Sequence, residues 1–249
     1  MIKRILALML SIVTAFGFSG VYGEEVSRAV LDFSAAERCA IEKAFSKFGL
    51  GEFSPEKAQK YSEINLRHWE MLERGEITKN EVLLLRFAEF LKYLNCDSAA
   101  PNEVNDYYES IIADKVAFIE NAPEICNDLA KDYDLYCVTN GSLTVQTKRL
   151  KNSGLDKYFK QIFISDEIGF EKPSIQFFEP VLKAVHREKS EIMIIGDSLT
   201  SDMKGGNNAG IKCCFYNPQG KAIEGDIKID YEIKSLGEIY AVLENESKI

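Results

Sequence analysis

The chain has 249 residues, of which 46% are hydrophobic and 28% are charged, an ordinary composition for a soluble globular protein. Its net charge of −9 argues against binding to a nucleic-acid backbone, because such binding needs basic patches that displace counterions. The charge does not exclude a small phosphorylated substrate, since a site can be locally positive on an acidic surface.

The first 23 residues have the pattern of a secretory signal peptide. Lys3 and Arg4 precede an uncharged, largely apolar run from Ile5 to Gly23, and Val21-Tyr22-Gly23 is an acceptable cleavage site. The run is also just long enough to span a bilayer as an anchor. A first core strand followed by a loop is a third interpretation, and it fits the pattern less well.

The cysteines favour a different compartment. None of the six forms a Cys-x-x-Cys pair, and three lie in apolar, strand-like runs, which predicts buried free thiols rather than zinc ligands or disulfides. Free thiols are typical of a reducing compartment, so they favour the cytoplasm, against the signal-peptide pattern. The six are Cys39, Cys96, Cys126, Cys137, Cys213 and Cys214.

The sequence pattern of residues 34–117 predicts a bundle of four helices with short connections. Capping signals begin three of them, at Ser34, at Ser54-Pro55 and at Thr78, and the fourth runs from about Pro101. His68 and Trp69 fall in the second helix, where packing inside the bundle is a better interpretation than catalysis.

After residue 118 strands alternate with helices, which predicts a doubly wound parallel α/β sheet. We expect strands at 134–138, 161–165, 192–196, 212–216 and near 231–233. We also expect residues 24–33 to belong to this core, so that the helical bundle is inserted into it.

Polar groups follow three of these strands, at the edge where open α/β sheets place their ligands. Thr139-Asn140-Gly141 offers a hydroxyl and N–H groups beside a helix N-terminus, which suits phosphate, although the same tripeptide is common in plain turns. Lys172 adds a positive charge. Asp197 and Asp202 offer oxygen ligands for Mg²⁺, although they could also end a strand and cap a helix.

Together these groups suit phosphoryl transfer, in which a hydroxyl, an ammonium group and a metal stabilise developing charge. The set resembles the haloacid dehalogenase-like hydrolases, and more narrowly their noncanonical pyrimidine 5′-nucleotidases. The stretches that carry the resemblance are Leu31-Asp32-Phe33-Ser34-Ala35-Ala36-Glu37, Val138-Thr139-Asn140-Gly141, Gly169-Phe170-Glu171-Lys172-Pro173, Gly196-Asp197-Ser198, Gly205-Gly206 and Ala209-Gly210.

The resemblance implies a Rossmann-like core with the helical bundle as a cap over the substrate. It implies Mg²⁺-dependent hydrolysis of a nucleoside monophosphate through an aspartyl-phosphate. Thr139 and Lys172 would be catalytic; they would bind phosphate with Asn140 and Gly141. Asp197 and Asp202 would be metal ligands.

The family's first motif, Asp-x-Asp-x-Thr, has no match here. Counting back from Asp32 by the family spacing gives Glu25, Ser27 and Ala29. Glu25 is one methylene longer than the expected nucleophile, and an error of about 1 Å in attack geometry costs on the order of 10²-fold in rate. Asp32 is a second candidate nucleophile, because Asp32-Phe33-Ser34 imitates a strand end.

Three hypotheses therefore stay open. The chain is a 5′-nucleotidase; or it is a non-catalytic relative that binds phosphate or a partner, exported or tethered by residues 5–23; or its N-terminal sequence is misread. The resemblance and the cysteines favour a cytoplasmic protein with a small phosphomonoester as its partner.

Overall fold

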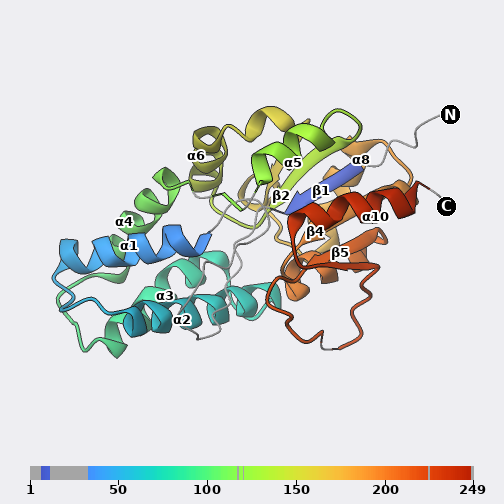
Figure 1. Ribbon diagram of the computed structural model, residues 1–249. Helices are drawn as coiled ribbons and strands as arrows, with labels where there is room; N and C mark the ends of the chain where they lie inside the picture. The colour runs from blue at the N-terminus through green and yellow to red at the C-terminus, as the bar shows by residue number, and fades with distance from the viewer. Residues whose placement is uncertain (1–6, 12–32, 117, 120, 224, 248–249) are drawn as a thin grey trace. The chain divides into compact units, whose positions relative to one another are not determined.

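The computed structural model describes residues 7–11, 33–116, 118–119, 121–223 and 225–247 (Figure 1). The described residues fall into two compact units: residues 7–11 with 118–247 form an α/β unit, and residues 33–116 form a helical unit. The helical unit is thus an insertion in the α/β unit. No helix among the described residues is long and apolar enough to cross a membrane.

The helical unit contains four helices, as the apolar periodicity predicts. Ser54 and Thr78 cap the second and third with their side chains, and Thr78 forms a reciprocal capping box with Glu81. His68 and Trp69 are buried in the bundle, which confirms their packing role. The four are α1 (Phe33–Phe48), α2 (Pro55–Glu73), α3 (Lys79–Tyr93) and α4 (Pro101–Asp114).

The α/β unit is built on a six-stranded, all-parallel sheet with the order β3-β2-β1-β4-β5-β6 (Figure 1). This confirms the predicted doubly wound sheet with an inserted helical bundle. Its strands are β1 (Ala7–Ser11), β2 (Asp134–Thr139), β3 (Gln161–Ile164), β4 (Ile192–Gly196), β5 (Lys212–Tyr216) and β6 (Tyr231–Ile233).

Helices and short helical turns connect the strands. They are α5 (Ala122–Leu129), α6 (Leu143–Ser153), η1 (Asp156–Tyr158), α7 (Ser165–Ile168), α8 (Ile175–Val185), η2 (Lys189–Glu191), η3 (Leu199–Met203), α9 (Lys204–Ala209), η4 (Leu236–Glu238) and α10 (Ile239–Glu246). One correction concerns Asp202, for which the sequence also allowed the role of a helix cap. A π-helical turn, η3, precedes α9, so Asp202 lies inside a turn and does not cap a helix.

The first strand lies earlier in the chain than we expected. β1 occupies the centre of the sheet, and its Met9 pairs in register with Tyr136 of β2 and Ile194 of β4. This placement differs from a signal peptide over residues 1–23 and matches the core-strand interpretation. A signal peptide and a strand buried on both faces have the same sequence signature, because each is an uncharged apolar run. Of residues 24–33, only Phe33 is described, and it begins α1.

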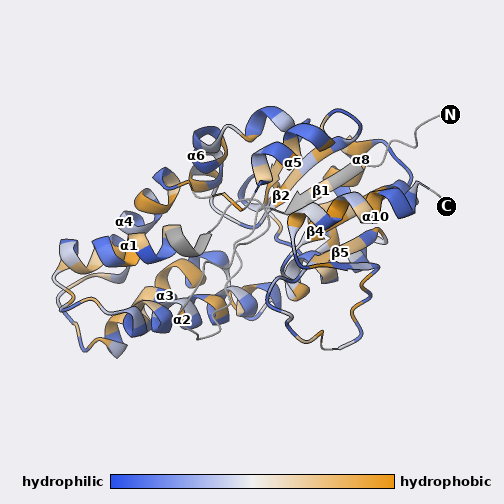
Figure 2. Cartoon of the chain, viewed as in Figure 1, coloured by the Kyte–Doolittle hydropathy of each residue, from blue (hydrophilic) through white to orange (hydrophobic). Residues whose placement is uncertain are grey.

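Side chains of alternate strand residues fill the core on one face of the sheet, where α8 supplies Phe177, Phe178 and Val181. The intervening residues, such as Cys137 and Ile195, are buried on the opposite face. α5 packs against η4, the turn that precedes α10. Figure 2 shows the consequence, with hydrophobic strands inside and helices that are hydrophilic on their outer sides.

Candidate functional site

The predicted site residues meet at the carboxyl edge of the sheet. Thr139 is the last residue of β2, Asp197 directly follows β4, and Lys172 lies in the loop between α7 and α8. All three are nearly fully buried, with exposed fractions of 0%, 6% and 2%. The structure therefore places the hydroxyl, the ammonium group and one carboxylate that the sequence pattern predicts along the same edge of the sheet.

Lys172 is held at its ammonium group from two directions. Its Nζ donates to Oδ1 of Asp202 at 2.6 Å and to the carbonyl oxygen of Val138 at 3.3 Å. A buried ammonium group needs such partners, because desolvation would otherwise make its charge very unfavourable. The contacts fix the cation beside the end of β2.

Lys172 is also held at its backbone. Its N–H donates to Oδ1 of Asn140, and Nδ2 of Asn140 donates to its carbonyl oxygen, both at 2.8 Å. The predicted phosphate-binding residue Asn140 thus directs its amide at the main chain of Lys172. The sequence pattern gave no signal for this contact, because the two residues are 32 positions apart.

Asp202 reaches Lys172 because the loop after β4 is folded tightly. Its Oδ2 accepts from the N–H of Ser198 at 3.2 Å, and Oγ of Ser198 accepts from the N–H of Ser201 at 3.1 Å. A Cβ at position 196 would lie 2.3 Å from Oδ2 of Asp202. Gly196 is therefore required by the close approach of this carboxylate.

Asp197 is better placed than Asp202 to hold a metal ion. Both carboxylates are hard oxygen ligands of the kind that Mg²⁺ prefers. Both oxygens of Asp202, however, already accept hydrogen bonds, one of them from the cation of Lys172. Within the described ranges, no three His, Cys, Asp or Glu side chains group as a metal site. Of the two aspartates, Asp197 is therefore the one that fits as a ligand.

The N-terminus of α6, predicted to bind phosphate, lies two residues beyond Gly141. Ser142 caps this helix by accepting from the N–H of Val145, and the N–H of Leu143 donates to Oδ2 of Asp166 at 2.8 Å. A carboxylate on the first turn is favourable for the helix dipole. A phosphate at that N–H would have to displace Asp166.

The candidates for the first motif lie outside the described residues: Glu25, Ser27, Ala29 and Asp32. The sequence nevertheless limits what β1 can contribute. No Asp or Glu occurs from Met1 to Gly23, so β1 and the twelve residues after it carry no carboxylate. A carboxylate nucleophile next to Thr139 would have to come from Glu24 or beyond.

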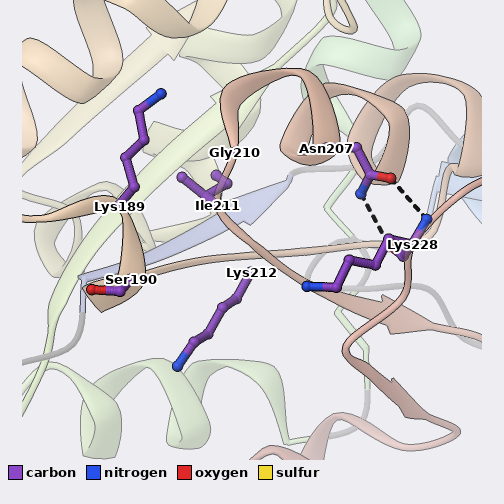
Figure 3. A pocket seen from close by; sticks show the side chains of 7 residues that line it. All are labelled: Lys189, Ser190, Asn207, Gly210, Ile211, Lys212 and Lys228. Carbon is purple, nitrogen blue, oxygen red and sulfur yellow. Dashed lines mark hydrogen bonds between the residues drawn. The ribbon is translucent and has the colours of Figure 1, made fainter.

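Two cavities lie away from these residues. One, of about 290 Å³, lies at the amino ends of β4 and β5 and is lined by Lys189, Lys212 and Lys228 (Figure 3). The other, of about 740 Å³, lies between α2 and α3 of the helical unit and is lined by Ile64, Leu85 and Tyr93 among others. Neither contains a predicted site residue.

Comparison with known proteins identifies the family of the chain. The sequence profile of the family described as haloacid dehalogenase-like hydrolase matches residues 29–216. HAD-hydrolase YfnB of Bacillus subtilis is 36% identical over 226 residues, which span 90% of this chain and 95% of that protein. These matches confirm the resemblance given by the sequence motifs.

Two further relatives are named after the substrate class on which they act. Pyrimidine 5′-nucleotidase PynA of Streptococcus pneumoniae is 32% identical over 222 residues, 88% of this chain and 93% of that protein. Pyrimidine 5′-nucleotidase YjjG of Escherichia coli is 28% identical over 192 residues, 77% of this chain and 84% of that protein.

A solved structure supports the fold. The crystal structure of YfnB from Bacillus subtilis bound to magnesium has a TM-score of 0.86 and 33% sequence identity. The alignment covers 97% of this chain and 99% of that one.

Proposed function

Because the chain belongs to the haloacid dehalogenase-like hydrolase family, we propose that it is a Mg²⁺-dependent phosphohydrolase that acts on nucleoside monophosphates, pyrimidine nucleotides in particular. The observation that carries the proposal is the buried ammonium group of Lys172, held between Val138 and Asp202 at the edge where Thr139 ends its strand. The names of PynA and YjjG support the substrate class.

Each residue of the site has a distinct role in this proposal. The hydroxyl of Thr139 binds a phosphoryl oxygen, and Lys172 offsets negative charge on the phosphoryl group as the bond to the leaving oxygen breaks. Asp197 would hold Mg²⁺, which when bound supplies Lewis-acid stabilisation of the same charge. Asp202 acts through Lys172 by fixing its ammonium group. Gly141 lets the backbone pass close to Gln146, because a Cβ there would lie 2.5 Å from Nε2 of that residue.

A second candidate function is phosphate binding without turnover. It is favoured by the absence of a carboxylate from Met1 to Gly23 and by Glu25, Ser27 and Ala29 at the positions of the family's Asp-x-Asp-x-Thr motif. Ser27 does not exchange protons near neutral pH as a carboxylate does. This candidate keeps the roles of Thr139 and Lys172 in binding and removes the aspartyl-phosphate step.

Phosphate release from UMP, dUMP and dTMP, measured with and without Mg²⁺, separates the two candidates. The test variant is Lys172→Ala, and the matched control is Lys131→Ala, which removes an exposed lysine that follows α5. Mg²⁺-dependent release that Lys172→Ala abolishes and Lys131→Ala keeps supports hydrolysis. If no variant releases phosphate, calorimetric titration with UMP decides: binding that needs Lys172 supports the non-catalytic candidate.

We also propose a cytoplasmic location, which the six free thiols support. Four of them, Cys126, Cys137, Cys213 and Cys214, are buried. Fractionation of cells that express the full chain tests this proposal. Recovery of the protein with the membrane or the secreted fraction would contradict it.

A further inference from the structure

We infer that Asn140 is a positioning residue that fixes Lys172 relative to Thr139; the inference rests on the proposed function. Thr139 and Asn140 are neighbours at the end of β2, whereas Lys172 belongs to a separate loop. For both Thr139 and Lys172 to contact one phosphoryl group, the distance between these segments must be held. Asn140 joins the two segments through the backbone of Lys172.

The contact between Asn140 and Lys172 has the form of a short piece of β-ladder. The amide oxygen accepts from the backbone N–H of Lys172 and the amide nitrogen donates to its carbonyl oxygen, each at 2.8 Å. Two hydrogen bonds to one residue fix its orientation as well as its distance. Both residues are nearly fully buried, so water does not compete for these groups.

The end of β2 therefore contacts both the ammonium group and the backbone of Lys172. The carbonyl oxygen of Val138 accepts from Nζ, while Asn140 binds the backbone of the same residue. Thr139 lies between these two contacts in the sequence. A shift of the Lys172 backbone would move the ammonium group away from Asp202 as well as from Thr139.

The same paired contact occurs elsewhere in the protein, which provides an internal control. Nδ2 of Asn207 donates to the carbonyl oxygen of Lys228 at 2.9 Å, and the N–H of Lys228 donates to Oδ1 of Asn207 at 2.8 Å (Figure 3). This pair fastens the segment before β6 to α9 and touches none of the proposed site residues. Loss of the Asn207 pair should affect stability without affecting chemistry.

The decisive variant is Asn140→Asp, with Asn207→Asp as its control. In each, one carboxylate oxygen can still accept from the lysine N–H, but the donor to the lysine carbonyl is lost. We expect kcat to fall by about 10- to 100-fold in Asn140→Asp with little change in KM, the effect typical of losing a group that orients a functional residue. Asn207→Asp should keep the kcat of the wild type.

A second measurement does not depend on turnover. Acetylation of lysines followed by peptide mass spectrometry reports how well Lys172, at 2% exposure, is protected. We expect protection in the wild type and in Asn207→Asp, and faster labelling in Asn140→Asp. If the wild type releases no phosphate, the proposed function fails while the labelling still decides the role of Asn140.

Asn140→Ser covers the case in which Asn140→Asp does not fold. Its hydroxyl is shorter and reaches at most one of the two backbone groups, so we again expect faster labelling of Lys172 and a lower kcat than in the wild type. Folding of each variant is checked by thermal unfolding. Equal labelling of Lys172 in folded Asn140 variants and in Asn207→Asp, or equal kcat values, would overturn the inference.

Discussion

Nζ of Lys172 and Oδ1 of Asp202 lie 2.6 Å apart, and the two side chains are only 3% and 2% exposed. Loss of one partner of such a pair leaves the other charge buried and uncompensated, which costs more than the pair itself contributes. The pair therefore links the stability of the α/β unit to the geometry of its proposed site.

We predict that Asp202→Asn lowers the free energy of unfolding by about 3–5 kcal/mol, because the ammonium group of Lys172 loses its counter-charge. Urea unfolding measures this change. The double variant Lys172→Met/Asp202→Asn should recover part of the loss, since no unpaired charge remains. Lys131→Met, which breaks the exposed pair with Asp128, is the control and should change stability little. Additive effects of the two site substitutions would contradict the coupling.

Gly196→Ala should weaken the same ion pair by displacing the carboxylate of Asp202. The new Cβ would lie 2.3 Å from Oδ2 of Asp202, so the carboxylate must move away from Lys172 and from the N–H of Ser198. Overpacking of this kind typically costs about 1–3 kcal/mol, and phosphate release should fall with it. Thermal unfolding and the nucleotide assay measure both effects. Gly237→Ala is the matched control, because nothing lies within 4 Å of a Cβ there. Similar behaviour of the two alanine variants would show that the loop adapts.

The sequence was sufficient to predict most of the elements, because their signals are local. Capping residues such as Thr78 and apolar periodicity mark the helices, and apolar runs such as Ile192–Gly196 mark the buried strands. The placement of Thr139 and Asp197 at one edge of the sheet was also predictable. In a parallel sheet the carboxyl ends of all strands share one edge.

The remaining features depend on contacts that no local pattern encodes. An apolar run such as Ala7–Ser11 fits a signal peptide as well as a central strand, and only its pairing with β2 and β4 separates the two. The partner of Asn140 is likewise set by tertiary structure. Asp202 has the chemistry of a metal ligand and of a lysine partner alike, and its distance to Lys172 favours the second role.

Buried thiols should make the protein less stable in alkali. Burial raises the pKa of Cys213 to about 11 and that of Cys126 and Cys214 to about 12, above the ordinary value of about 8.5. Each thiol thus keeps its proton longer in the folded than in the unfolded state. Their contribution to stability is complete below pH 8.5 and is lost progressively as the pH rises towards 11–12.

We therefore expect the free energy of unfolding, measured with urea between pH 7 and pH 10, to fall above pH 8.5. Cys214→Ala removes one of the three groups, so its stability should fall less steeply than that of the wild type. The comparison uses the slopes, because the substitution itself also changes stability at pH 7. Equal slopes for the two proteins would contradict a raised pKa at Cys214.

Met9 provides the sharpest test of where the first strand lies. Its side chain is fully buried in the core cluster that contains Tyr136, Phe163 and Ile194. Met9→Ala should leave a cavity and lower the free energy of unfolding by about 2–5 kcal/mol. A residue in a detachable leader would have no such effect, because it would contribute nothing to the folded core. Urea unfolding of the full chain measures the difference, and Leu84→Ala, at a 45% exposed position of α3, is the control. If the two substitutions lower the free energy of unfolding by equally small amounts, the placement of β1 at the centre of the sheet is contradicted.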